Sequence, residues 1–442
     1  MIWSYRFLSL PFHFALAPSW IMHMRRRGGY GTGFCQRFGR FPKLPRLEPG
    51  RRRLWIHAVS LGEVQALKVL VEKLLADGRY DIVHTATSSS GLSMARKLYN
   101  GLATVLAFPI DFWIFSKNAW NCIEPDVLIH ADGELWPEHL HQAHLRSVPV
   151  VVANCRLSER SFRRHMRFRF LSNGIWRSVT DIFPDGPATV DRLRRLSVDD
   201  NKIHRPGNIK CDRTPMDPLS PSARAAILEE IGLPGHGLDG GETPILVGCS
   251  TWPGEEEFLV DVLARLRIGN PNWRLLLVPR HCERRMELKK MLERRGLPFH
   301  MRSFGRAKST DATVALVDSV GELAQFMGVG TIAFLGKTLP PNDGAQSPLD
   351  AIAAAVALVA GPAVGNFSDM IGELLAEKAI SMGRCASEVA DLLVAIGESP
   401  SLRKCMAETA TKWLRRSCGT ADRICKRIET LAFRETLKTI VD

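Results

Sequence analysis

The chain has no Cys-x-x-Cys pair, although its 442 residues include ten cysteines and 13 histidines. This pattern gives no support to a disulfide framework or to a zinc site. Scattered cysteines of this kind are typical of buried, reduced thiols in a cytosolic protein. We therefore predict that the chain holds no metal and no cofactor.

Two nucleotide-binding signatures are missing as well. No glycine turn that follows an expected strand has the G-x-G-x-x-G pattern, and no P-loop with Gly-Lys-Ser/Thr occurs. The sequence therefore gives no support to a dinucleotide fingerprint or to a Walker-type ATP site.

The N-terminus lacks the uninterrupted run of about 20 apolar residues that crosses a bilayer. Residues 1–24 are rich in aromatic and aliphatic side chains, but Arg6, Pro11 and Pro18 interrupt them. Because the positive cluster Arg25–Arg27 follows the apolar part, a signal peptide is not favoured. We predict a membrane-associated anchor, interfacial or short-spanning, with Arg25–Arg27 on the cytoplasmic side of the membrane. The alternative is a helix that packs on the domain surface.

Positive charge is concentrated in the same region. Residues 1–53 hold eleven Lys and Arg against Glu48 alone, a net of +10, which leaves +3 of the formal +13 for the rest of the chain. A basic segment beside an apolar terminus favours a membrane surface with anionic lipid over a nucleic-acid groove. We therefore predict no nucleic-acid partner.

The length predicts two domains. In both, apolar runs alternate with helical patterns, which is typical of a doubly wound, parallel α/β sheet. The strands expected in the first domain are residues 54–59, 81–87, 104–108, 126–131 and 148–153. Those expected in the second are residues 244–250, 273–278, 313–318 and 331–335. Prolines 215, 218 and 221 mark the boundary, so we expect an anchor at 1–24 and domains at 25–213 and 214–442.

Polar side chains directly follow two strands of the first domain. Ser60 and Glu63 come after the first strand, and Asp132 and Glu134 come after the fourth. Open α/β sheets bind ligands at this edge, where two acids can supply a general base and an electrostatic partner. Alternatively, Glu63 and Glu134 only balance the dipoles of the helices that they open.

Residues 161–170 form a basic and aromatic segment, with four arginines and a histidine interleaved with three phenylalanines. Such a segment can bind RNA, phospholipid or lipid phosphates. A solvated helix face is the more common explanation.

Strand ends in the second domain carry groups suited to a phosphate. Arg280 and His281 follow one strand, Gly321 and Glu322 follow another, and the loop 336–348 precedes a helix that begins at Leu349. Glycine turns and helix N-termini, together with an arginine, form an anion site.

Taken together, these motifs resemble the Kdo transferases of lipid A biosynthesis, where Kdo is 3-deoxy-D-manno-octulosonate. The resemblance covers nearly the whole chain. It rests on the apolar N-terminus and on Arg37-Phe38-Gly39, His57-Ala58-Val59-Ser60-Leu61-Gly62-Glu63, Glu134-Leu135-Trp136-Pro137, Ala153-Asn154-Cys155-Arg156-Leu157-Ser158, Gly207-Asn208-Ile209-Lys210-Cys211-Asp212, Ser250-Thr251-Trp252-Pro253-Gly254-Glu255-Glu256, Pro279-Arg280-His281, Gly321-Glu322 and Gln346-Ser347-Pro348-Leu349-Asp350. The resemblance implies a membrane-associated, inverting glycosyltransferase of the GT-B type, with two Rossmann-like domains that face each other across a cleft. It implies a CMP-Kdo donor and a lipid A precursor (lipid IVA) as acceptor.

The resemblance also implies roles for individual residues. Glu63 would be the general base, and Asp132 and Lys210 would stabilise the transition state. Residues that would bind the CMP moiety are Arg280, His281, Val320, Gly321, Glu322, Ser347, Pro348, Leu349 and Asp350. The leaving phosphate would then need no divalent metal.

Three positions depart from the family pattern. Asp132 and Asp350 stand where the family usually has glutamate, so each acid is shorter by one methylene. Lys337 stands where the family usually has a second glycine after Gly336. These changes affect donor affinity and efficiency more than the type of reaction, because small positioning errors slow catalysis. Two alternatives remain: a GT-B transferase that uses another nucleotide sugar, and an inactive, membrane-bound homologue that only binds.

Overall fold

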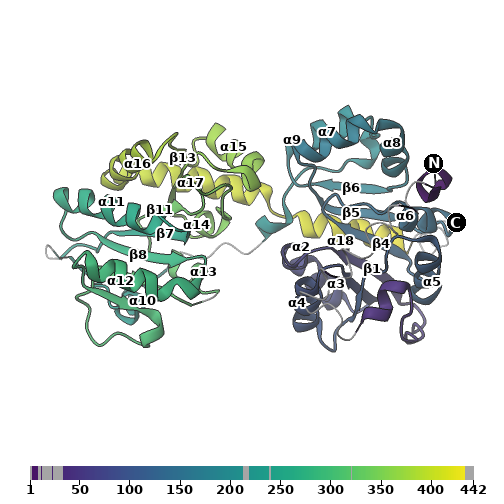
Figure 1. Cartoon of the computed structure of the whole chain (residues 1–442), viewed down its shortest axis with the longest axis horizontal. Coiled ribbons are helices and arrows are strands. Elements are labelled where there is room, and N and C mark those ends of the chain that lie inside the picture. The colour runs from purple at the N-terminus through teal and green to yellow at the C-terminus, as the bar shows by residue number, and fades with distance from the viewer. Residues whose placement is uncertain are drawn as a thin grey trace. The chain divides into compact units, whose positions relative to one another are not determined.

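The computed structural model describes residues 2–7, 11, 22, 33–212, 219–237, 240–319 and 321–433, without the side chains of residues 170, 171 and 366. The chain divides into two compact units, one of Met1–Arg213 with Ser417–Asp442 and the other of Thr214–Arg416. Each unit is built on one parallel β-sheet (Figure 1).

The first unit holds a six-stranded sheet in the order β3-β2-β1-β4-β5-β6. Its strands are β1 (Arg52–Ala58), β2 (Tyr80–Ala86), β3 (Thr104–Ala107), β4 (Val127–Ala131), β5 (Val150–Cys155) and β6 (Asp181–Pro184). His57 of β1 pairs with Thr85 of β2 on one side and with His130 of β4 on the other. The strand order therefore reverses between β1 and β4, and open sheets of this type bind ligands at such a switch point.

Helices cover both faces of this sheet, which is why its strands read as almost continuous apolar runs. They are η1 (Phe34–Phe38), α2 (Leu61–Ala66), α3 (Lys68–Asp77), α4 (Ser89–Tyr99), α5 (Trp113–Ile123), α6 (Pro137–Leu145), α7 (Glu159–Arg167), α8 (Arg169–Arg177), α9 (Pro187–Arg195), η2 (Asp200–Lys202), η3 (Ile209–Asp212) and α18 (Thr420–Ala432). Leu54 and Ile56 of β1 pack into a core that includes α3 and α18, whereas Trp55 packs against Trp120 of α5.

The C-terminal helix differs from the sequence-based expectation that residues 214–442 form one domain. Helix α18, yellow in Figure 1, belongs to the first unit. Asp212 fixes its start, because its carboxylate accepts hydrogen bonds from the backbone N–H groups of Thr420 at 3.2 Å and Ala421 at 2.5 Å. Ile424 and Ile428 of α18 are fully buried in the first core.

The second unit holds a seven-stranded sheet in the order β13-β12-β11-β7-β8-β10-β9. Its strands are β7 (Ile245–Thr251), β8 (Arg274–Pro279), β9 (Phe299–Met301), β10 (Val314–Leu316), β11 (Ile332–Leu335), β12 (Ala357–Ala360) and β13 (Ser381–Met382). Its helices are α10 (Pro221–Glu230), α11 (Glu255–Gly269), η4 (Cys282–Arg284), α12 (Arg285–Arg294), η5 (Arg302–Phe304), α13 (Leu323–Met327), α14 (Leu349–Ala353), η6 (Gly365–Phe367), α15 (Ser368–Ala376), α16 (Ala386–Glu398) and α17 (Pro400–Ser417). The switch point of this sheet lies between β7 and β11.

Every strand expected from the sequence is present, to within a few residues at each end. The strands that the sequence did not reveal are β6, β9, β12 and β13. They have two to four residues each.

The prediction of buried thiols is wrong for most of the cysteines. All ten are free, but only Cys155, Cys211 and Cys249 are buried. Two of these three lie within strands of the sheets, β5 and β7. Others lie on helices or at helix ends, as Cys385 does at the start of α16, where one side faces solvent.

The predicted anchor, residues 1–24, lies mostly outside the described residues. Residues 2–7 are helical, with Trp3 and Phe7 largely exposed. Within the described residues, no helix has the length and apolar character needed to span a bilayer.

Candidate functional site

Glu63 lies in the first turn of α2, directly after β1. Ser60 is the N-cap of this helix, and its Oγ accepts a hydrogen bond from the Glu63 N–H at 3.4 Å. The Glu63 carboxylate accepts in return, from the Ser60 hydroxyl at 2.8 Å and from the Val59 N–H at 2.7 Å. This reciprocal pattern is a form of capping box. Glu63 therefore does stabilise the start of a helix, as the alternative interpretation of the sequence proposed. The same hydrogen bonds also fix its carboxylate at the switch point.

The surroundings of Glu63 give its carboxylate unusual acid–base properties. Burial raises the pKa of Glu63 to about 7, and the negative charges of Asp132 and Glu134 act in the same direction. The hydrogen bonds from Val59 and Ser60 oppose the rise. A carboxylate with a pKa near neutrality can take a proton in the transition state and return to its ionised form at cellular pH.

Asp132 stands at the end of β4, across the switch point from Glu63. Its backbone is left-handed, with φ at 52°, and its Oδ1 accepts a hydrogen bond from Nδ2 of Asn154 at 3.2 Å. Asn154 also has a left-handed backbone, with φ at 56°, and its Oδ1 accepts from the Ile209 N–H at 2.9 Å. One amide side chain therefore joins Asp132 to the turn η3, which carries Lys210.

The charges near Asp132 are balanced by two cations. Burial raises the pKa of Asp132, whereas Lys210, the hydrogen bond from Asn154 and Arg156 oppose that rise. The structure thus brings together three residues that the sequence assigned to catalysis: Glu63, Asp132 and Lys210.

Two members of this cluster were not predicted as site residues. Asn154 and Arg156 belong to a motif that carries the family resemblance, but no role was assigned to them. Both stand at the end of an apolar strand, which is the same signal that revealed Asp132.

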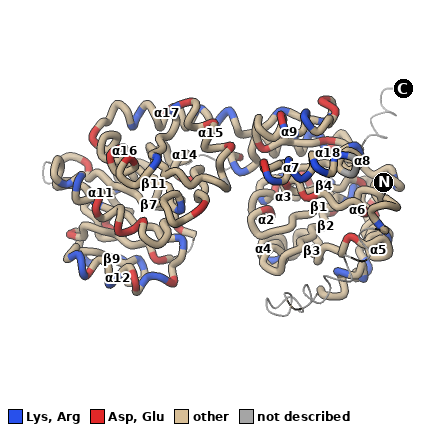
Figure 2. The backbone as a smooth tube through the Cα atoms, turned by 45° about the horizontal axis from the view of Figure 1, so that its top comes forward, with Lys and Arg blue, Asp and Glu red and all other residues tan. Residues whose placement is uncertain are grey.

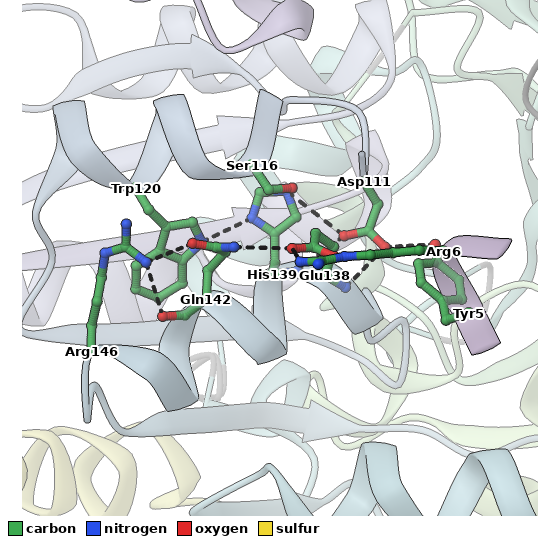
Figure 3. Close-up of polar contacts among 9 residues, drawn as sticks. All are labelled: Tyr5, Arg6, Asp111, Ser116, Trp120, Glu138, His139, Gln142 and Arg146. Atoms are coloured by element: carbon green, nitrogen blue, oxygen red, sulfur yellow. Dashed lines mark hydrogen bonds and ion pairs between the residues drawn. The ribbon is translucent and has the colours of Figure 1, made fainter. Parts of the chain in front are cut away.

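The loop between Asp132 and α6 is held at both ends. At the α6 end, Asp111 accepts hydrogen bonds from the backbone N–H groups of Glu138 at 3.2 Å and His139 at 3.1 Å. Figure 3 shows how the N-terminal segment joins this network. The Tyr5 hydroxyl donates to Asp111 at 2.7 Å, and the Arg6 guanidinium donates twice to Glu138, at 2.9 and 2.7 Å.

Helix α7 carries the basic and aromatic segment that the sequence singled out. Figure 2 shows Lys and Arg along this helix. Phe162 is buried in the core, with the Arg195 guanidinium 4.5 Å from its ring centroid, whereas the Arg163 side chain is 77% exposed and pairs with Glu159. Burial raises the pKa of Glu134, the charge of Asp132 acts in the same direction, and the charge of Arg164 opposes the rise. The basic side of α7 is therefore largely exposed to solvent, and the charge of Arg164 reaches the sheet edge where Asp132 and Glu134 lie.

The residues predicted to bind CMP lie at the carboxyl edge of the second sheet. Arg280 follows β8 and is exposed, and the His281 ring meets the Trp252 ring edge-on at 4.9 Å between centroids. Gly321 has a left-handed backbone, with φ at 89°. The Glu322 carboxylate accepts hydrogen bonds from Arg302 and Ser319, which lower its pKa.

The remaining predicted residues lead into helix α14. The Ser347 Oγ accepts a hydrogen bond from the Leu349 N–H at 3.4 Å, and Pro348 is the N-cap of α14. Burial raises the pKa of Cys249 in β7, and the charge of Asp350 adds to the rise, so the start of α14 lies near that strand. Val320 lies outside the described residues.

The part of the chain that the structure describes contains no group of three or more His, Cys, Asp or Glu residues placed to hold a metal ion.

Comparisons with known proteins show which family the chain resembles. Residues 32–213 match the family model described as 3-deoxy-D-manno-octulosonic-acid transferase (kdotransferase). The chain is 29% identical to the 3-deoxy-D-manno-octulosonic acid transferase of Haemophilus influenzae over 79% of this chain and 77% of that protein. It is 26% identical to the enzyme of the same name from Bordetella pertussis over 92% of this chain and 93% of that protein.

Among solved structures, the Anabaena protein HepE (Alr3699) in complex with UDP shares the fold. The TM-score is 0.58 at 12% identity, over 86% of this chain and 100% of that one. A similarity at this identity shows the fold alone, and it agrees with the expected GT-B architecture of two parallel-sheet domains. Residues 32–213 therefore match the model of the 3-deoxy-D-manno-octulosonic-acid transferase family, the chain is similar to enzymes of that name over most of its length, and these similarities identify it as a glycosyltransferase.

Proposed function

We propose that the chain transfers Kdo from CMP-Kdo to lipid IVA, a lipid A precursor, with inversion at the anomeric carbon. The names of its relatives support the sugar that is transferred. The observation that supports the mechanism most directly is the environment of Glu63. Its carboxylate lies at the switch point, has a pKa of about 7, and is close enough to Asp132 to be affected by the Asp132 charge.

In the proposed reaction an acceptor hydroxyl attacks the anomeric carbon of Kdo. The oxygen–carbon bond forms as the bond from that carbon to the CMP phosphate breaks, and Glu63 takes the hydroxyl proton. A single displacement of this kind inverts the anomeric centre. Asp132 stabilises the positive charge that develops on the sugar. Burial raises the pKa of Asp132, and the charge of Lys210 opposes that rise.

The second unit supplies the groups for the nucleotide. Arg280 is a cation at the end of β8, and the Trp252 and His281 rings lie beside it. Arg302 holds the Glu322 carboxylate, which opens helix α13 after the Gly321 turn. These groups fit a phosphate and a base at the carboxyl edge of the sheet.

We also propose that the protein works at the cytoplasmic face of the inner membrane. Trp3 and Phe7 are 76% and 81% exposed, and they flank Tyr5 and Arg6, which point into the domain. Exposed aromatic residues next to basic residues are typical of segments that lie in a lipid interface. Binding to anionic vesicles that is lost in Trp3→Ser/Phe7→Ser would support this location, and unchanged binding would contradict it.

The test of the reaction is mass spectrometry of tetraacylated lipid IVA after incubation with enzyme and freshly generated CMP-Kdo. We expect the wild type to add one or more Kdo masses and Glu63→Ala to add none. Glu388→Ala is the matched control, because Glu388 also opens a helix and accepts the backbone N–H of the residue four positions earlier, Arg384, at 2.9 Å. Loss of transfer in both variants would mean that Glu63 matters only as a cap. No transfer by the wild type would refute the proposed function.

A further inference from the structure

Nine residues other than glycine have a left-handed backbone in the described part of the chain. Five of them follow the last turn of a helix, a common place for this conformation: Glu124, Ser147, Ser197, Ala355 and Lys378. The other four stand at the ends of parallel strands: Asp132, Asn154, Ser250 and Lys337. A left-handed backbone costs energy in residues that carry a side chain. Away from helix ends, residues in this conformation cluster at functional sites.

In the first unit, the left-handed residues at strand ends lie in the site already described. Asp132 and Asn154 belong to the cluster around Glu63. In the second unit, Ser250 is the next-to-last residue of β7 and Lys337 follows β11, and these two strands flank the switch point of the sheet. Lys337, with φ at 64°, therefore occupies in the second unit the kind of position that Asp132 occupies in the first.

The protein itself fixes the Lys337 backbone. A Cβ atom on Gly336 would lie 2.2 Å from the Ser250 carbonyl oxygen, so the turn after β11 rests directly on the end of β7. The buried Glu255 carboxylate accepts hydrogen bonds from the backbone N–H groups of Lys337 at 2.8 Å, Thr338 at 2.9 Å and Leu339 at 3.1 Å. Successive N–H groups of this kind can bind an anion, but here the protein's own carboxylate already fills them. The positive group that this turn offers to a ligand is then the Lys337 ammonium.

The Lys337 ammonium lies close to the segment proposed to bind the nucleotide. Its Nζ is 4.7 Å from the centroid of the Trp252 ring, a cation–π distance. The Trp252 ring in turn contacts the His281 ring. The aromatic pair thus holds a lysine at the carboxyl edge of the sheet, beside Arg280 and His281.

We propose that Lys337 is a further binding residue, which pairs with an anionic group of the nucleotide-activated donor. That group is either the phosphate of the nucleotide or the carboxylate of the sugar. The inference rests on the proposed function, because it takes the second unit as the donor-binding unit.

The test compares Lys337→Gly with Lys378→Gly in the full-length protein. Both changes remove a lysine and relieve a left-handed side chain, but Lys378 is an exposed residue that follows α15. Calorimetry gives the affinities for CMP and for cytidine, and a transfer assay gives the KM for CMP-Kdo. Thermal melts show whether each variant folds.

We expect Lys337→Gly to melt no lower than the wild type, because glycine adopts this backbone without strain. We expect its donor interaction to weaken by about tenfold or more, the loss typical of a hydrogen bond to a charged group. Weaker CMP binding with unchanged cytidine binding would assign the phosphate. Unchanged CMP binding with a higher KM for CMP-Kdo would assign the sugar carboxylate. Lys337→Arg should restore the lost affinity, and Lys378→Gly should change neither quantity.

Two results would overturn the inference. If the wild type binds CMP and transfers Kdo, but Lys337→Gly changes neither CMP affinity nor KM, the lysine has no binding role and the proposed function stands. If the wild type neither binds CMP nor transfers Kdo, the proposed function fails and the inference fails with it.

Discussion

The ion pair between Arg6 and Glu138 allows a quantitative prediction about the N-terminal segment. Glu138 is fully buried, and two of its hydrogen bonds come from the Arg6 guanidinium, whose side chain is 20% exposed. Arg6→Met keeps much of the volume of the side chain but leaves the carboxylate buried, with the Gln142 amide at 3.0 Å as its remaining side-chain donor. Removing one partner of a buried pair costs about 3–5 kcal/mol, because the other charge stays desolvated.

The exposed pair of Arg163 and Glu159 provides the control. Its N–O distance of 2.9 Å is similar, but the two side chains are 77% and 51% exposed. Solvent screens such a pair, so Arg163→Met should cost less than about 1 kcal/mol. The two variants remove the same charge from the same unit and differ in the burial of the partner.

Urea denaturation, monitored by the hydrogen exchange of amides in α6, measures the change in the stability of the first unit separately from the second. We expect Arg6→Met to lower the free energy of opening at α6 by several times the change in Arg163→Met. The double variant Arg6→Met/Glu138→Met should regain most of the loss, because neither charge of this pair then remains. Equal and small effects of Arg6→Met and Arg163→Met would refute the reasoning, and the N-terminal segment would then contribute nothing to the anchoring of α6.

Two further predictions concern pH. Because a general base acts in its ionised form, the transfer rate at saturating substrate should fall as the pH drops below about 7, the pKa of Glu63; a rate that is flat between pH 6 and pH 8 would contradict this role. Burial lowers the pKa of His84 and His130 to about 4, whereas the ordinary value for histidine is 6.5. Between these two values the unfolded chain binds more protons than the folded chain. The folded state therefore loses stability as the pH falls from about 6.5 towards 4. Burial of Asp111, whose pKa is raised to about 6, acts in the opposite sense over part of that range. His84→Leu removes two ring nitrogens that have no hydrogen-bond partner among the residues that the structure describes. This change should make the Tm less sensitive to acid, and an unchanged dependence of Tm on pH would count against the explanation.

Local patterns in the sequence revealed the parts of the fold that are set locally. The run from Leu54 to Glu63 predicted a strand, a tight turn and a helix start, and it corresponds to β1 and α2. The same reasoning placed Asp132 at a strand end. Each of these signals needs only neighbouring residues, because burial on both faces of a parallel sheet gives apolar runs that end abruptly.

Long-range contacts explain what the sequence did not show. Asp212 caps α18 across more than 200 residues of chain, so no local pattern reveals that this helix returns to the first unit. Arg6 reads as an interruption in an apolar segment, yet its partner Glu138 lies 132 residues away. Asn154 was part of a recognised motif, but its role depends on reaching Asp132 and Ile209 at once.

The structure also shows the surroundings of two positions at which the sequence departs from the family pattern, Lys337 and Asp132. Lys337 stands at a left-handed position, which explains why glycine suits that turn. Asp132 is held by Asn154 and is subject to the charges of Lys210 and Arg156. The shorter acid therefore keeps its place at the switch point, with two cations that oppose the rise of its pKa.

The most direct test of the account is Kdo transfer to tetraacylated lipid IVA, measured by mass spectrometry with wild type, Glu63→Ala and Glu388→Ala side by side. The account predicts added Kdo with the wild type and Glu388→Ala, and none with a folded Glu63→Ala. Transfer by Glu63→Ala at the wild-type rate would contradict the assignment of the base. Absence of transfer by a folded wild type would contradict the proposed reaction itself.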